Sequence, residues 1–159
     1  MPFYSTKAET DIACSAMDVY SYITNPANWD DGRPVDDPGW TLVPPGRRPA
    51  GTTWHEDRGE DWAILEAEPG RRWIVRSVDG SSSVTITYSI SEVDGMTHVF
   101  RHMEIEVPEE AAIDEHARAA FACSSSGREL VTQIKHALEG ARRVVLPDVP
   151  LPASTSQTS

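Results

Sequence analysis

The chain has 159 residues, of which 39% are hydrophobic and five are tryptophan, and its formal net charge at pH 7 is -11. This length and apolar content are typical of one globular domain with a substantial core, not of a disordered chain. A surface this acidic repels phosphate backbones and anionic headgroups, so neither nucleic acid nor membrane is expected as a partner.

The N-terminal part predicts a strand and two short helices. The strand is expected over Phe3–Ala13, and Ser15 is a suitable N-cap for a helix over Ala16–Thr24. Asn25-Pro26 then ends this helix, and Pro26 suits the first turn of a second short helix over Ala27–Asp31.

The segment Gly32–Ala50 contains five prolines and three glycines, which predicts irregular backbone with a brief strand at Trp40–Val43. Long irregular loops in compact domains are often functional. Trp29 and Trp40 flank this loop. They either form an aromatic lid over a ligand or simply anchor the loop.

Five further strands are expected, separated by turn signals such as Pro69-Gly70 and Asp94-Gly95. Strands joined by short turns indicate an antiparallel meander. The expected strands are Thr52–Asp57, Trp62–Glu68, Arg72–Val78, Ser83–Glu92 and Thr97–Val107.

A long amphipathic helix is expected over Asp114–Arg143, with a hollow on its inner face. The second half of its apolar stripe has large residues, whereas the first half has Ala120, Cys123 and Gly127, with Ser124 beside them. Glycine inside a helix costs about 1 kcal/mol relative to alanine. Either an aromatic side chain from the sheet fills the space, or a ligand cavity lies there.

The remaining composition predicts a cytoplasmic protein without a metal or cofactor. Cys14 and Cys123 lack metal-binding spacing and fit reduced thiols, and no secretory signal, zinc motif, nucleophile elbow or phosphate loop occurs. No apolar run approaches the roughly 20 residues that span a bilayer. Pro147–Ser159 is rich in Pro, Ser and Thr, which predicts a disordered tail after a domain of residues 1–146.

Three segments resemble one superfamily. They are the strand–helix–turn segment that runs through Ser15–Trp29, the Gly51-Thr52-Thr53-Trp54 strand opening, and the closing helix Leu130–Glu139. In this order they resemble the START-like, Bet v 1-like (SRPBCC) superfamily, whose bacterial members include polyketide cyclases/dehydrases. Asn25 stands where this superfamily commonly has aspartate. The resemblance implies an α+β helix-grip fold, in which a curved antiparallel sheet wraps around a long C-terminal helix and encloses a ligand cavity.

Strand alternation selects the residues that face such a cavity. Val99, Arg101 and Met103 share the apolar face of their strand, so Arg101 is expected to point inward. It either binds an anionic oxygen of a ligand or extends to water at the rim. Ile86 and Tyr88 share a face of the preceding strand, where Tyr88 either orients a carbonyl or is a core tyrosine.

For the other candidate residues, strand and helix periodicity does not decide which way the side chain points. If the face with Trp62 points inward, Glu66 becomes a buried carboxylate suited to proton transfer; otherwise it is a surface glutamate. Trp54 is a candidate for the cavity wall. His116 begins the helix stripe as either a proton shuttle or a capping or core histidine.

Two functions fit these residues. The first is a cofactor-independent cyclase or dehydratase of natural-product biosynthesis, which acts on a hydrophobic, carbonyl-rich, polyketide-like intermediate. Arg101 would then stabilise an oxyanion, Tyr88 would bind the carbonyl, and His116 or Glu66 would move the proton. The alternative is a non-catalytic carrier of a hydrophobic small molecule. Either a monomer or a homodimer is compatible with the sequence.

Overall fold

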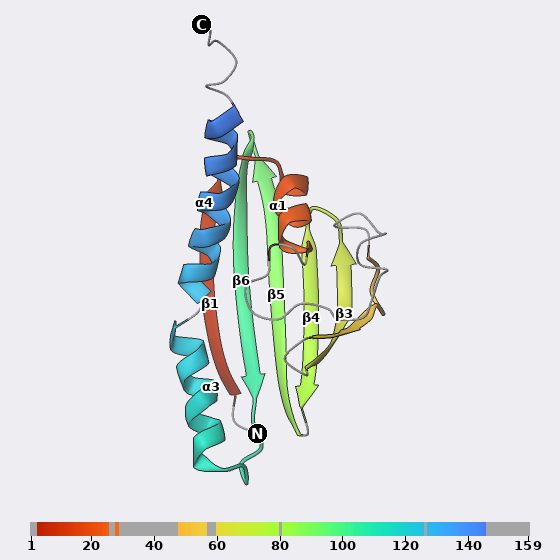
Figure 1. Cartoon of the computed structure of the whole chain (residues 1–159), viewed down its shortest axis with the longest axis vertical. Coiled ribbons are helices and arrows are strands. Elements are labelled where there is room, and N and C mark those ends of the chain that lie inside the picture. Colours follow the sequence, from red (N-terminus) through yellow and green to blue (C-terminus); the bar gives the residue numbers. More distant parts are fainter. Residues whose placement is uncertain are drawn as a thin grey trace, which may run out of the picture.

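The computed structural model describes residues 3–25, 28, 48–56, 60–79, 81–125 and 127–145. Within them, one six-stranded antiparallel sheet is accompanied by three helices (Figure 1). The strands are β1 (Phe3–Ile12), β2 (Thr53–His55), β3 (Asp61–Glu68), β4 (Arg72–Asp79), β5 (Ser82–Val93) and β6 (Met96–Glu106). The helices are α1 (Ala16–Ile23), α3 (Ile113–Ser125) and α4 (Gly127–Val145).

The sheet has the strand order β1-β6-β5-β4-β3-β2. Strands β2 to β6 form the predicted meander, and β1 pairs with β6 at one edge. The two-residue turn at Asp94 and Gly95 links β5 to β6, and both residues have positive φ, at 53° and 78°. This conformation matches the right-handed twist of paired strands, which is why the Asp-Gly signal predicted the hairpin correctly.

Helix α1 follows β1 as the sequence predicts. The Ser15 side chain accepts a hydrogen bond from the Asp18 amide at 3.1 Å, which caps the helix, and Glu92 accepts one from the Ala16 amide at 2.7 Å. The helix buries Val19 and Tyr20 against the core. Of the second short helix expected over Ala27–Asp31, only Asn28 is described, and the strand expected at Trp40–Val43 lies outside the described residues.

The single helix expected over Asp114–Arg143 is instead two helices, α3 and α4. Gly127 is therefore the first residue of α4 and does not lie inside a continuous helix. Both helices contact β1 and β6, and Figure 1 shows them following one another along this side of the sheet. Helix α4 supplies the large residues of the predicted stripe, since Val131 and Ile134 are buried and Leu138 packs against the core.

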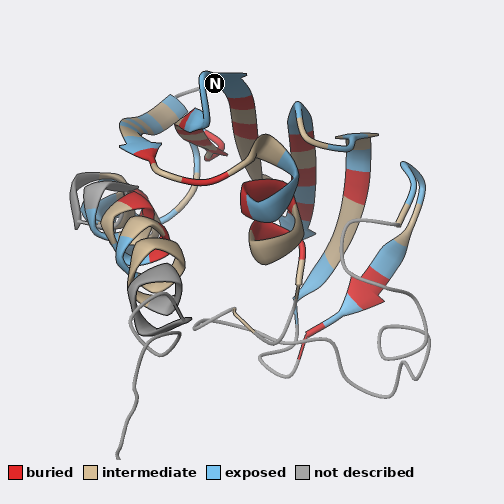
Figure 2. Ribbon diagram, turned by 90° about the horizontal axis from the view of Figure 1, so that it is seen from above, coloured by how far each residue is buried: buried red, intermediate tan, exposed pale blue. Residues whose placement is uncertain are grey.

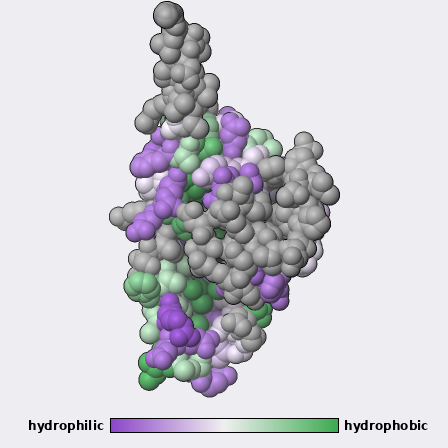
Figure 3. All heavy atoms as spheres, in the orientation of Figure 1, coloured by the Kyte–Doolittle hydropathy of each residue, from purple (hydrophilic) through white to green (hydrophobic). Residues whose placement is uncertain are grey.

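The core lies between the sheet and the helices. Buried bands alternate along the strands, as expected when one face of a sheet is covered (Figure 2). One cluster of buried side chains joins α1, β2–β6 and Ile134 of α4, and a second surrounds Met103, Ile105 and Ala119 near α3. Apolar side chains are visible between α3 and the sheet in the space-filling view (Figure 3).

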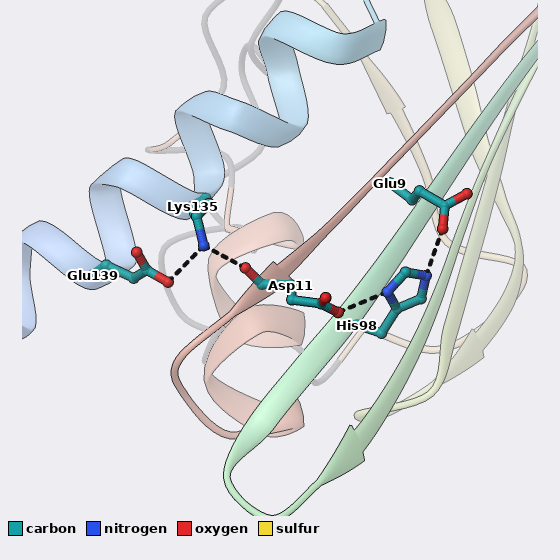
Figure 4. Close-up of polar contacts among 5 residues, drawn as sticks. All are labelled: Glu9, Asp11, His98, Lys135 and Glu139. Atoms are coloured by element: carbon teal, nitrogen blue, oxygen red, sulfur yellow. Dashed lines mark hydrogen bonds and ion pairs between the residues drawn. The ribbon is translucent and has the colours of Figure 1, made fainter.

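Polar contacts hold α4 on the end of β1 (Figure 4). Lys135 Nζ donates to the Asp11 carbonyl at 2.6 Å and lies 2.9 Å from Glu139 Oε2. The same carboxylate oxygen accepts a hydrogen bond from the Ala13 amide at 3.0 Å. These contacts set the position of α4 relative to the sheet, and with it the width of the space between them.

Candidate functional site

A cavity of about 640 Å³ lies between the sheet and the three helices. Its floor consists of residues from β2 to β6, and its helical wall includes Ile23 of α1, Ala122 of α3, and Leu130 and Ile134 of α4. The volume is large enough for a small organic molecule of drug size.

The register of the sheet arranges the floor in rows. Arg101, Tyr88 and Trp73 are directly opposite one another on β6, β5 and β4, and they form the first row. A second row joins the apolar side chains of Met103, Ile86 and Val75 on the same strands. In a third row, Ile105 pairs with Val84, and further along the row Trp62 pairs with Trp54. All of these side chains line the cavity.

Arg101 is the buried cation of the cavity, with 4% of its surface exposed. Its Nε donates to the Tyr88 hydroxyl at 3.2 Å, and its Cζ lies 5.8 Å from the centre of the Tyr88 ring. Nη2 lies 4.0 Å from Met103 Sδ, a weak acceptor, whereas Nη1 has no hydrogen-bond partner in the described part of the chain. No carboxylate among the described residues forms an ion pair with it.

A buried cation is unfavourable unless an anionic or strongly polar group pairs with it. An anionic or strongly polarised oxygen of a ligand would satisfy it. The inward orientation that alternation predicted for Arg101 and Tyr88 is present, and the pair gives the cavity one polar site in an otherwise apolar row.

The other end of the cavity is aromatic and acidic. The rings of Trp54 and Trp62 stack with centres 6.2 Å apart and planes 10° from parallel. Trp54 Nε1 donates to Glu56 Oε2 at 3.1 Å, and Glu56 lines the cavity although only 7% of its surface is exposed. The sequence analysis did not select Glu56 as a site residue. Its position two residues from Trp54, on the same face of a strand, could have identified it.

The position of Glu66 corrects one prediction. Trp62 does face the cavity, but the pairing of β3 with β4 shifts between Ile64 and Glu66, which is a β-bulge. Because of the bulge, Glu66 does not follow Trp62 and Ile64 inward. It lies beside Arg72 at the surface, 3.7 Å from the Arg72 Nε. Glu66 is not part of the cavity lining.

The helix residues also differ from prediction. Ala120 is exposed, and its neighbours Ala119 and Ala122 turn inward instead, because the stripe extrapolated from α4 does not keep its phase across the division between the helices. Cys123 is half-buried and packs beside the cluster of Met103. Burial raises the pKa of its thiol, and the nearby Arg101 charge acts in the opposite direction.

His116 lies away from the cavity, near the start of α3. Its Nδ1 is 2.8 Å from the Tyr4 hydroxyl, so it joins α3 to β1 rather than facing the ligand space. Trp29 and Trp40, with the proposed lid, lie outside the described residues. Ser124 and Gly127 lie at the end of α3 and the start of α4, but the structure does not describe their side-chain environment.

In sequence, the chain matches no family model and no curated protein. In structure, it is similar to the polyketide-cyclase-like protein Cgl2372 from Corynebacterium glutamicum, with a TM-score of 0.63 and 18% identity over 87% of this chain and 94% of that one. The chain has the START-like, or Bet v 1-like, fold.

Two other solved structures share this START-like fold. Ara h 8.0201 matches with a TM-score of 0.55 and 12% identity, over 88% of this chain and 97% of that one. CalU16 from Micromonospora echinospora matches with a TM-score of 0.51 and 13% identity, over 86% of this chain and 74% of that one. The predicted helix-grip architecture is therefore confirmed. None of the described helices has the length and apolar character to cross a membrane.

Proposed function

We propose that the protein is a cofactor-independent cyclase or dehydratase that acts on a hydrophobic, carbonyl-rich, polyketide-like intermediate in this cavity. The observation that carries the proposal is the buried Arg101–Tyr88 pair on the cavity floor. The structural similarity to Cgl2372, a polyketide-cyclase-like protein, supports it.

The pair has the donors that an aldol-type ring closure requires. A methylene group between two carbonyls is acidic, and Arg101 stabilises the enolate that forms when it loses a proton. The enolate carbon then bonds to a second carbonyl carbon, whose oxygen becomes an alkoxide. Because the Tyr88 hydroxyl accepts its hydrogen bond from Arg101, its own proton is available to that oxygen.

These proton transfers need no cofactor. The methylene proton passes to a solvent water molecule, and the Tyr88 phenolate regains a proton from solvent after it has protonated the alkoxide, so ring closure is an isomerisation. A following dehydration releases one water molecule. The apolar rows around the pair hold the chain in a folded conformation and bring its two carbons together. Since neither His116 nor Glu66 lines the cavity, proton transfer at this end is assigned to Tyr88.

The experiment that tests the proposal starts with the bound molecule. Native mass spectrometry of the protein purified from its source, followed by extraction, should identify an apolar compound that bears carbonyl groups. With that compound or its linear precursor, Arg101→Met and Tyr88→Phe should each reduce turnover by about a hundredfold or more. If no compound is bound and a panel of hydrophobic molecules gives no thermal shift, the proposal is wrong.

A non-catalytic carrier is the second candidate. The observation that favours it is that the two residues expected to move a proton, His116 and Glu66, lie outside the cavity. A carrier releases its ligand chemically unchanged. In that case Arg101→Met and Tyr88→Phe would reduce affinity, and incubation with the linear precursor would yield no cyclic product.

A further inference from the structure

The β2 end of the cavity has both an acceptor, the Glu56 carboxyl group, and a donor, Trp62 Nε1. Glu56 Oε2 already accepts from Trp54 Nε1 at 3.1 Å, and a carboxyl group has room for further hydrogen bonds. Trp62, whose ring stacks on that of Trp54, has a buried Nε1 without a hydrogen-bond partner in the described part of the chain. Glu56 and both tryptophans line the cavity.

This end is far from Arg101. In the strand order, β6 and β2 are four steps apart, which corresponds to roughly 19 Å measured along the sheet. Glu60, which is exposed, also lines the cavity, and its carbonyl accepts from the Glu56 amide at 2.8 Å. Arg101 attracts an anionic oxygen, so it orients a ligand with this oxygen away from the Glu56 end.

We propose that the Glu56–Trp62 end recognises a hydroxyl group of the ligand. A hydroxyl group both donates and accepts, so it can donate to the Glu56 carboxyl group and accept from Trp62 Nε1. A carbonyl or an ether oxygen can only accept, and an ammonium group can only donate. Of these groups, only a hydroxyl uses both partners.

The substrate class follows from the two ends together, and it rests on the proposed function of the cavity. The ligand is an elongated apolar molecule with an anionic or enolisable oxygen at the Arg101 end and a hydroxyl group at the Glu56 end. Its middle part contacts the apolar residues of the second row, Met103, Ile86 and Val75.

Three matched probes separate the two ends in calorimetric titrations of the full chain. Dodecanoate has only the carboxylate, ω-hydroxydodecanoate adds a hydroxyl group, and ω-methoxydodecanoate adds an oxygen that cannot donate. We expect the hydroxy acid to bind about tenfold more tightly than dodecanoate. We expect the methoxy acid to bind no more tightly than dodecanoate.

Variants of Glu56 and Trp62 test whether these residues cause the tenfold gain in affinity. Glu56→Gln keeps an acceptor for Trp54, and Trp62→Phe keeps the aromatic ring; each should reduce the gain from the hydroxyl group to about threefold or less. The matched control is Glu104→Gln, because Glu104 lies between Met103 and Ile105 on β6 and belongs to the opposite face of that strand. Glu104→Gln should leave the tenfold gain in affinity from the hydroxyl group unchanged. Arg101→Met should weaken all three acids alike and preserve the gain.

The outcomes distinguish this inference from the proposed function. If dodecanoate binds in an Arg101-dependent manner but the hydroxyl group adds nothing, hydroxyl recognition is wrong and the cavity proposal stands. A gain that persists in both Glu56→Gln and Trp62→Phe leads to the same conclusion. If none of the three acids binds, hydroxyl recognition is wrong, and the proposed function is decided by the extracted compound and the thermal-shift panel.

Discussion

Arg101 and Tyr88 face each other across the β5–β6 pair, and the guanidinium Nε donates to the phenolic oxygen at 3.2 Å. The register of two long strands fixes this contact, so it does not depend on a loop. The remaining contact of the guanidinium that the structure gives is with a thioether, at 4.0 Å. Within the described ranges of the chain, the hydrogen-bond partners of this buried charge are therefore neutral.

Replacing the Arg101 charge should stabilise the protein. Arg101→Met has a similar volume and removes a buried cation that has no anionic partner among the described residues, so we expect the free energy of unfolding to rise by about 1 kcal/mol or more. Urea denaturation measures it. Arg76→Met, at an exposed position on β4, is the control and should change little. A large loss of stability in Arg101→Met would show that the guanidinium is well satisfied in the empty cavity.

Tyr88→Phe should have the opposite effect on stability. It removes the oxygen that accepts from Arg101 Nε and leaves a second buried donor unsatisfied, at a cost of about 1–3 kcal/mol.

A double-mutant cycle with Arg101→Met isolates the interaction. In the Arg101→Met background, the cost of Tyr88→Phe should fall below about 1 kcal/mol, because no donor is left unsatisfied. Equal costs in the two backgrounds would contradict the coupling.

The floor of the cavity was predictable from sequence where the strands are long and regular. Strands β5 and β6 keep their alternation along their whole paired length, so Ile86, Tyr88, Arg101 and Met103 all fall on the predicted face. The fold was predictable for a related reason. The order of strand, short helix, meander and closing helical segment, with strong turn signals, permits few arrangements.

The parts that sequence could not predict depend on breaks in periodicity. The bulge after Ile64 reverses the faces of β3, and no residue type in that strand marks it. Trp62 therefore faces the cavity without bringing Glu66 with it, and of the two environments considered for Glu66 the surface one is present. The division between α3 and α4 likewise shifts the inward position from Ala120 to Ala119 and Ala122. Glu56 was overlooked because glutamate normally faces solvent, although the expected strand over Thr52–Asp57 places it on the same face as Trp54.

Glu139 should contribute to stability more than a surface glutamate does. Its carboxylate contacts Lys135 (Figure 4). It also accepts a hydrogen bond from the Ala13 amide, and its side chain is only 15% exposed. We expect Glu139→Ala to lower the free energy of unfolding by about 1–3 kcal/mol in urea denaturation. His136→Ala, at an exposed position of the same helix, is the control. If the two variants are equally stable, the contacts to Glu139 do not hold α4 in place.

Tyr20 should make stability depend on alkaline pH. Burial, and secondarily the Glu68 carboxylate, raises the pKa of the Tyr20 hydroxyl from its ordinary value of 10.0 to about 12. The raised pKa means that the folded chain keeps this proton after the unfolded chain has lost it. The resulting stability is fully present below pH 10, and it falls by about 1.4 kcal/mol per pH unit between the two pKa values.

Tyr20→Phe removes this dependence. Because the hydroxyl is buried without a hydrogen-bond partner in the described part of the chain, its removal should not destabilise the protein at neutral pH. Urea denaturation of both proteins from neutral to alkaline pH gives the difference in their free energies of unfolding. This difference should stay constant up to about pH 9 and then move in favour of Tyr20→Phe as the pH rises further. A difference that stays constant throughout would mean that the Tyr20 hydroxyl ionises as easily in the folded chain as in the unfolded one.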